Sequence, residues 1–343
     1  YAVNMLVEEV NGAGGLKVGD QTYSIRVVTE DNESKAESAV SAATKLITED
    51  QVLAIIGSYA SKQAIPTGEV ANARKTPNIS PWSTNPRTTL NRPWVFRACF
   101  IDPYQAKVAA SFAQEEFGVS KVAVLYDVAS DYPKGLAENF RDAAIDLGME
   151  VVAFETFTTK DRDFSSQLTK IINSGAELLF SPQYYDEVPL IVSQAKQLGW
   201  DKPILGSDSW SSPELVKLAG EDVIGYYFTS HYAMKGATGK TKEFIDKYKA
   251  KYGYEPGDVA ALAWDATNIL FEAIKNTGGL SGDLQADRKA IRDQLAKVER
   301  WEGTTGLMSF TEEGDPIKAV VIVRIDEEGE FSFYKMAIPP ELK

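Results

Sequence analysis

Apolar and polar positions switch between a helical period and a strand period along most of the chain. The apolar residues of 1–10 recur at helical spacing, and this pattern ends at the glycine-rich segment 11–15, where a left-handed backbone can terminate a helix. Tyr23, Ile25 and Val27 alternate as in a strand. The same periodicities predict strands at 52–56, 122–126, 150–154, 178–181 and 204–206, and helices at 36–48, 62–73, 133–147, 164–173 and 188–198.

The order of these elements predicts the fold class. Strands separated by single helices require right-handed crossovers, and they favour an α/β fold of two doubly wound parallel-sheet lobes. Beyond Tyr232 the pattern changes to helices at 241–252, 259–276 and 288–298, followed by strands at 319–325 and 330–334. We assign 1–101 and 231–320 to lobe one, and 102–230 and 321–343 to lobe two. Because no long linker separates the lobes, we expect several short crossings and a hinged cleft.

The composition excludes several classes of protein. The 343 residues include 36 basic and 49 acidic side chains, a formal net charge of −13, so neither nucleic acid nor an anionic membrane surface is an expected partner. One cysteine and one histidine leave no CxxC pair and no histidine-rich motif for a metal. No apolar run approaches the roughly 18 residues of a membrane span. If the protein is exported, we expect its targeting segment to precede Tyr1.

The chain lacks the motifs of common catalytic sites. A nucleophile needs a base and an orienting group, and the sequence offers a single histidine, His231. It contains no GxSxG, no GxxxxGK[ST] and no GxGxxG motif after a strand. Adjacent acids such as Glu8 and Glu9 are typical of a solvated surface. We therefore expect neither an enzyme nor a bound cofactor.

Two polar loops follow predicted strands, at the edge where open α/β sheets bind ligands. Ser61 starts a helix after the strand at 52–56, where its hydroxyl and free backbone N–H groups can hold a carboxylate or simply cap the helix. Trp82, Ser83 and Thr84 follow the segment 78–81 and form either a second group of donors beside an aromatic ring or an ordinary turn with a packing tryptophan. Both loops are candidate ligand sites.

A third group of candidates lies in the second half of the chain. Tyr132, Tyr184 and Trp210 come just after predicted strands, and Asp208 occupies the same kind of position. Aromatic walls, hydroxyls and one acid suit a small zwitterion better than a sugar phosphate or an inorganic ion. A buried acid is costly unless a cation such as a ligand ammonium neutralises it. Asp208 could instead cap the helix near Ser212, and position alone leaves both interpretations open.

Taken in order, eight stretches of the chain resemble the type 1 periplasmic solute-binding proteins of ABC importers, in particular the branched-chain (Leu/Ile/Val) amino acid-binding family. The resemblance covers essentially the whole chain, and the order and spacing of the stretches make it specific. The stretches are VEEVNGAGG (7–15), IIGSYAS (55–61), ISPWST (79–84), VFR (95–97), KVAVLYD (121–127), DFS (163–165), GYYFTS (225–230) and KYKAKYG (247–253).

The resemblance implies a two-lobed receptor that closes on an L-amino acid, aliphatic or aromatic, or a close analogue, and delivers it to a membrane permease. Its site would be divided between the lobes. Lobe one would hold the ligand carboxylate through Ser61, Thr84 and the backbone near Trp82 and Ser83. In lobe two an acid, here Asp208, would meet the ammonium, with Tyr184 nearby and Tyr132 as the aromatic that closes on the ligand.

Two departures from the family pattern bear on these expectations. Trp82 stands where several relatives have a small residue, so the side-chain pocket is either reduced or presents a flat wall to an aromatic ligand. Relatives also begin with a strand before the first helix, so we expect the intact protein to contain one. A sensor of amides or other small carboxylates, with the same fold and no transport, is the alternative function.

Overall fold

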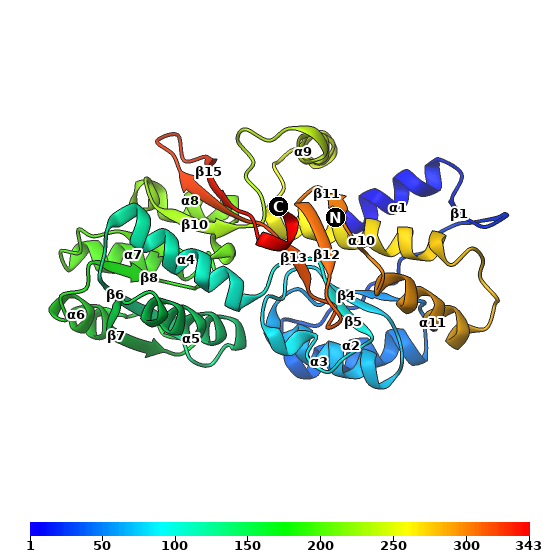
Figure 1. Ribbon diagram of the computed structural model, residues 1–343, viewed down its shortest axis with the longest axis horizontal. Helices are drawn as coiled ribbons and strands as arrows, with labels where there is room; N and C mark the ends of the chain where they lie inside the picture. Colours follow the sequence, from blue (N-terminus) through cyan, green and yellow to red (C-terminus); the bar gives the residue numbers. More distant parts are fainter. The chain divides into compact units, whose positions relative to one another are not determined.

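The chain crosses more than once between two structural units in the computed structural model, which describes residues 1–343 (Figure 1). The first unit comprises Tyr1–Phe100, Glu243–Lys318 and Pro339–Lys343, and the second comprises Ile101–Lys242 and Ala319–Ile338. No helix is both long enough and apolar enough to span a membrane. Each unit is described separately below.

The unit boundaries differ from the predicted lobes at two longer segments, and residues 101 and 319–320 also lie in the second unit instead of the first. Residues 231–242 lie in the second unit instead of the first, because Lys235 pairs with Ser332 in an isolated parallel bridge and forms a 2.8 Å ion pair with Asp326. Residues 339–343 lie in the first unit instead of the second, because the 3-10 helix η4 (Pro340–Leu342) contacts strand β13 (Pro316–Lys318).

A seven-stranded sheet forms the centre of the second unit, in the order β15-β14-β10-β9-β8-β6-β7. The five strands from β10 to β7 are parallel; the sequence predicted four of them, β6 to β9, and did not predict β10. β14 runs antiparallel to both of its neighbours, β10 and β15. The chain reverses its direction of winding between β6 and β8, so the carboxyl ends of these strands flank a topological switch point. The strands are β6 (Lys121–Asp127), β7 (Glu150–Phe157), β8 (Leu178–Phe180), β9 (Ile204–Gly206), β10 (Tyr227–Ser230), β14 (Val320–Ile325) and β15 (Phe331–Ala337).

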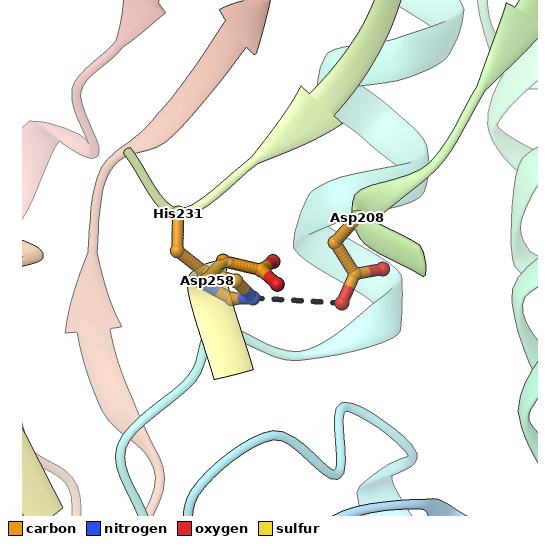
Figure 2. A group of neighbouring side chains, drawn as sticks. All are labelled: Asp208, His231 and Asp258. Carbon is orange, nitrogen blue, oxygen red and sulfur yellow. Dashed lines mark ion pairs between the residues drawn. The ribbon is translucent and has the colours of Figure 1, made fainter. Parts of the chain in front are cut away.

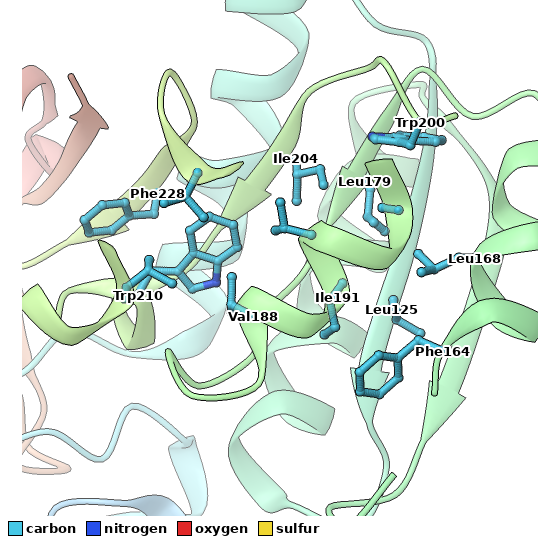
Figure 3. Close-up of a cluster of buried hydrophobic side chains, with 14 of the residues drawn as sticks. Leu125, Phe164, Leu168, Leu179, Val188, Ile191, Trp200, Ile204, Trp210 and Phe228 are labelled. Atoms are coloured by element: carbon cyan, nitrogen blue, oxygen red, sulfur yellow. The ribbon is translucent and has the colours of Figure 1, made fainter. Parts of the chain in front are cut away.

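Helices cover both faces of this sheet because side chains along β6 alternate between them. Val122 and Val124 pack with residues of α4 (Asp102–Phe117) and α5 (Asp131–Asp146). Ala123 and Leu125 pack on the opposite face with residues of α6 (Ser165–Asn173), α7 (Val188–Gln197) and α8 (Pro213–Ala219), part of which Figure 3 shows. The result is the doubly wound architecture expected from the strand–helix alternation.

The first unit contains a smaller parallel sheet, β3-β4-β5, formed by β3 (Ile55–Ile56), β4 (Asn78–Ser80) and β5 (Val95–Arg97). Two residues beyond β5, the single thiol Cys99 is fully buried. A separate antiparallel sheet of β11 (Trp301–Gly303), β12 (Gly306–Phe310) and β13 has no counterpart in the predicted elements. The helices are α1 (Ala2–Gly12), α2 (Ala36–Thr48), α3 (Ser61–Ala73), α10 (Asp258–Asn276), α11 (Leu284–Leu295) and, apart from its first residues, α9 (Gly239–Tyr252).

The predicted strand through Tyr23, Ile25 and Val27 is wrong beyond its first residue. Strand β2 (Gln21–Tyr23) pairs with β1 (Leu16–Val18) in a hairpin, and 24–30 form no strand. The Asn11 side chain accepts from the Ile25 N–H and donates to the Ile25 carbonyl, both at 2.8 Å, in place of a neighbouring strand. A cavity of about 640 Å³, lined in part by Ile25, Val27 and Ile55, adjoins this segment. The alternating pattern is present, but no strand pairs with it.

Candidate functional site

The second-unit candidates follow the carboxyl ends of three parallel strands. Tyr132 is the second residue of α5, which follows β6; Tyr184 lies in the loop after β8; and Asp208 begins the 3-10 helix η2 (Asp208–Trp210) after β9. Parallel strands carry their carboxyl ends at one edge of a sheet, so these loops meet there. The rings of Tyr132 and Tyr184 are in contact, with centroids 5.4 Å apart.

One oxygen of the Asp208 carboxylate, Oδ1, accepts two hydrogen bonds from side chains of the second unit. Oδ1 accepts from Gln105 Nε2 at 2.7 Å and from the Tyr132 hydroxyl at 2.5 Å. The same hydroxyl lies 2.8 Å from Ser207 Oγ, and Gln105 Nε2 also lies 2.7 Å from Thr229 Oγ1. Burial, followed by the negative charge of Asp208, raises the pKa of Tyr132 well above its usual value. Tyr132 therefore keeps its proton and remains a donor to the carboxylate.

The other oxygen of Asp208 is available. The residue is fully buried, and Oδ2 makes no hydrogen bond. His231 follows β10, and Figure 2 shows its ring directed at Asp208, with 3.5 Å between Nε2 and Oδ2. A side-chain oxygen of Ser212, not of Asp208, caps α8. The helix-cap interpretation of Asp208 is therefore wrong, and a buried carboxylate oxygen is left for a cation.

The first-unit candidates form a cluster of buried hydroxyls. Ser61 is the first residue of α3, and Ala60 is the N-cap, so the serine is not itself the cap residue. Ser83 Oγ donates to Ser61 Oγ at 2.9 Å and lies 2.6 Å from Thr88 Oγ1. Thr84 Oγ1 is buried and makes no hydrogen bond. Ser61 and Ser83 thus lie at or beside the amino end of α3, which favours anions, and Thr84 is the next residue after Ser83.

Trp82 forms an aromatic pair with Tyr59, a residue that the sequence analysis did not single out. Their ring centroids are 5.8 Å apart; Trp82 is 7% exposed and Tyr59 is 47% exposed. The indole N–H of Trp82 donates to Asp258 Oδ2, at the start of α10, at 3.2 Å. This bond fixes the orientation of the indole, whose plane is tilted by 39° from that of the Tyr59 ring.

A buried arginine holds the loop that carries Ser83. Arg97 Nη1 donates to the carbonyls of Ser83 and Asn85 at 2.6 and 2.9 Å, and Nη2 donates to Thr89 Oγ1 at 2.6 Å. Its Nε forms a 2.7 Å ion pair with Asp315. A guanidinium presents several donors in a rigid plane, which suits it to bind several loop carbonyls at once.

Two acids near the topological switch point are linked through an amide. Gln183 bonds Glu187 Oε2 through its side-chain nitrogen at 2.9 Å and the Asp127 N–H through its side-chain oxygen at 2.5 Å. Burial, followed by the charges of Asp186 and Asp127, raises the pKa of Glu187 to about 7. The carboxyl therefore titrates near neutral pH in the loop that carries Tyr184.

The structure brings the predicted residues together within each unit: Ser61 with Ser83, and Tyr132 with both Tyr184 and Asp208. Sequence reasoning missed Gln105 and gave His231 no role in binding. His231 could have been found, because it too directly follows a strand. Gln105 gave no such signal, since it lies inside the first turns of α4.

Comparisons with known proteins agree with this architecture. The sequence profile of the family described as periplasmic binding protein matches residues 1–330. The leucine-, isoleucine-, valine-, threonine- and alanine-binding protein of Pseudomonas aeruginosa is 28% identical over 312 residues, which are 91% of this chain and 80% of that protein.

Two solved structures are closely similar to the chain. A leucine-binding protein, LivK, from Thermotoga maritima has a TM-score of 0.89 and 34% identity, covering 99% of this chain and 94% of that one. The branched-chain amino acid transporter substrate-binding protein LivJ from Streptococcus pneumoniae, in complex with isoleucine, has a TM-score of 0.88 and 33% identity, covering 98% of this chain and 93% of that one.

Proposed function

Because the chain belongs to the periplasmic binding protein family, we propose that it is the extracytoplasmic receptor of an ABC importer and binds an L-amino acid or a close analogue for delivery to a permease. The observation that carries the proposed ligand class is the buried, unbonded Oδ2 of Asp208. The relatives described above include a binding protein for leucine, isoleucine and valine and a branched-chain amino acid transporter substrate-binding protein, which supports transport over the sensing alternative.

The ammonium group of the ligand is the proposed partner of Asp208. A buried carboxylate needs a compensating cation or several donors. Oδ1 accepts two hydrogen bonds from neutral groups, whereas Oδ2 accepts none and faces the His231 ring at 3.5 Å, a pair that is ionic only when the histidine is protonated. A charge-assisted hydrogen bond to the ligand ammonium contributes about 1.5–3 kcal/mol. Tyr184 lies beside Tyr132, which itself bonds Asp208, so both rings would border the ligand near its amino end.

The carboxylate group of the ligand is the proposed partner of the first-unit cluster. Ser61 begins α3, whose free backbone N–H groups attract a negative charge. Thr84 Oγ1 is a buried hydroxyl without a partner, and Ser83 keeps its hydroxyl beside Ser61. Trp82, held by Asp258, would meet the ligand side chain, which favours an aliphatic or aromatic residue over a charged one.

Calorimetric titration of leucine into the wild type and Asp208→Asn tests this function. Asparagine keeps the shape of the side chain and an acceptor for Gln105 but removes the charge that would pair with the ammonium. We expect Asp208→Asn to weaken binding by about 2 kcal/mol or more, with little change in the thermal stability of the ligand-free protein.

The matched control is Asp163→Asn, which removes a solvent-exposed carboxylate of the same unit and should leave leucine affinity unchanged. Unaltered leucine binding by Asp208→Asn would contradict the assignment of the ammonium partner. If the wild type binds neither leucine nor any other amino acid, the proposed function itself is wrong.

A further inference from the structure

Gln105 is a fully buried residue of α4 that connects two other elements of the second unit. Its Nε2 donates to Asp208 Oδ1 in η2 and to Thr229 Oγ1 in β10, both at 2.7 Å. These partners lie 103 and 124 residues away in the sequence. We propose that Gln105 is a positioning residue that orients Asp208 and thereby sets the preference of the site for ligands bearing an amine. This inference rests on the proposed function.

The two oxygens of Asp208 have unequal surroundings, and Gln105 contributes to that difference. Oδ1 receives both Gln105 and the Tyr132 hydroxyl, whereas Oδ2 receives no hydrogen bond. The torsion that rotates an aspartate carboxylate is broad and weakly restrained by itself. Two donors on one oxygen restrain that rotation, so Oδ2 is held as the available acceptor.

The chemistry of an amide suits this task better than that of the other polar side chains of similar size. A glutamate at this position would place a second negative charge against Asp208, and a methionine would offer no donor. Because Thr229 Oγ1 also accepts from Nε2, both N–H groups of the Gln105 amide are hydrogen-bonded. The Gln105 Oε1 is also buried without a hydrogen bond, so the network retains two unused acceptors, and an ammonium has three N–H groups to donate.

The test compares leucine with its keto acid, 4-methyl-2-oxopentanoate, by calorimetric titration into the wild type, Gln105→Met and Gln114→Met. The keto acid keeps the carboxylate and the side chain of leucine but has a ketone in place of the carbon that bears the ammonium, so it lacks the group that Asp208 would meet. We expect Gln105→Met to lower leucine affinity about 10-fold or more and keto acid affinity less than 2-fold. Gln114 lies on the same helix and bonds the Leu147 carbonyl, outside the network, so its variant should behave as the wild type.

A second variant keeps the test decisive if Gln105→Met does not fold. Thr229→Val removes the acceptor that holds the far side of the amide, and it should reduce the preference for leucine over the keto acid in the same direction but by less. Equal losses for both ligands, or no loss for either, would overturn the positioning role. Failure of the wild type to bind leucine would overturn the proposed function and this inference together, an outcome that the wild-type titration alone reveals.

Discussion

Glu187 is a buried acid whose charge state responds to pH near neutrality. It is 5% exposed, accepts from Gln183, and has a pKa raised to about 7 by burial and by two neighbouring acids. The folded protein therefore holds this proton more tightly than the unfolded chain does. The resulting stability is present below the ordinary carboxyl pKa of 4.5 and is lost as the pH rises through about 7.

We predict that Glu187→Gln removes this pH dependence. The wild type should lose about 3 kcal/mol in the free energy of unfolding between pH 4.5 and pH 7.5 through this group, whereas the neutral amide should not titrate. Urea unfolding at several pH values measures the difference between the two proteins. Glu214→Gln, an exposed acid paired with Lys217, is the control and should retain the wild-type pH dependence. Parallel curves for the wild type and Glu187→Gln would contradict the prediction.

Individual site residues could be predicted to different extents. The sequence could predict four residues of the candidate site because each follows the end of a strand, where sheet topology gathers ligand-binding groups. These residues are Ser61, Ser83, Tyr132 and Asp208. The sequence could not predict Gln105, because its hydrogen-bond partners are more than 100 residues away in the chain and only folding brings them to α4.

At the scale of elements, α10 and the small antiparallel sheet are joined by buried hydrogen bonds to Asp265, whose negative charge also acts on Lys318. Asp265 in α10 accepts from the backbone N–H groups of Thr304 and Thr305, each at 2.8 Å. Lys318 in β13 donates to Thr305 Oγ1 at 2.6 Å and to the Ala98 carbonyl at 3.1 Å. Burial raises the pKa of Asp265 and lowers that of Lys318 to about 8, while the Asp265 charge partly offsets the shift in Lys318.

We predict that Asp265→Ala lowers the free energy of unfolding by about 3–5 kcal/mol, because it removes the acceptor of two backbone N–H groups and the negative charge that offsets the burial of Lys318. The double variant Asp265→Ala, Lys318→Met should lose less than the sum of the two single variants, since neither charge is then left unpaired. Urea unfolding of the wild type, the two single variants and the double variant provides the free energies for this double-mutant cycle. Strictly additive losses would show that Asp265 and Lys318 do not act as a pair.

Strands with a continuous apolar run, such as β6, β8 and β9, were predicted correctly, and several strands that mix apolar with polar or exposed positions, such as β12, were not. The strands β6 to β9 and their helices follow the sequence pattern because both faces of the sheet are buried. The sheet β11-β12-β13 was missed because its short strands contain no run of buried apolar residues. β8 and β9 are also short, but all their residues are buried. The segment after Tyr23 alternates but lacks a pairing strand, which periodicity alone does not reveal.

At the scale of the whole molecule, ligand binding should appear as added stability. If leucine binds the folded protein and not the unfolded chain, leucine at 100 times its dissociation constant should raise the free energy of unfolding by about 2.7 kcal/mol. A thermal-shift screen of amino acids, keto acids and amides measures this effect and ranks the ligands. Larger shifts with amides than with any amino acid would contradict the proposed ligand class.

The division of the chain into two units was foreseen in outline, and its boundaries were not. Two successive runs of strand–helix alternation indicate two sheets. The segments 231–242 and 339–343 carry no periodicity that assigns them to a sheet, and tertiary contacts such as the Lys235–Asp326 ion pair decide their place.

The burial of Cys99 makes the protein convenient to convert into an optical reporter. With its native thiol enclosed, a newly introduced cysteine would be the one group open to maleimide dyes, without prior removal of the natural residue. Tyr59 is a suitable attachment point, since it is half exposed and adjoins Trp82. A polarity-sensitive fluorophore attached there would change its fluorescence emission when the solute binds.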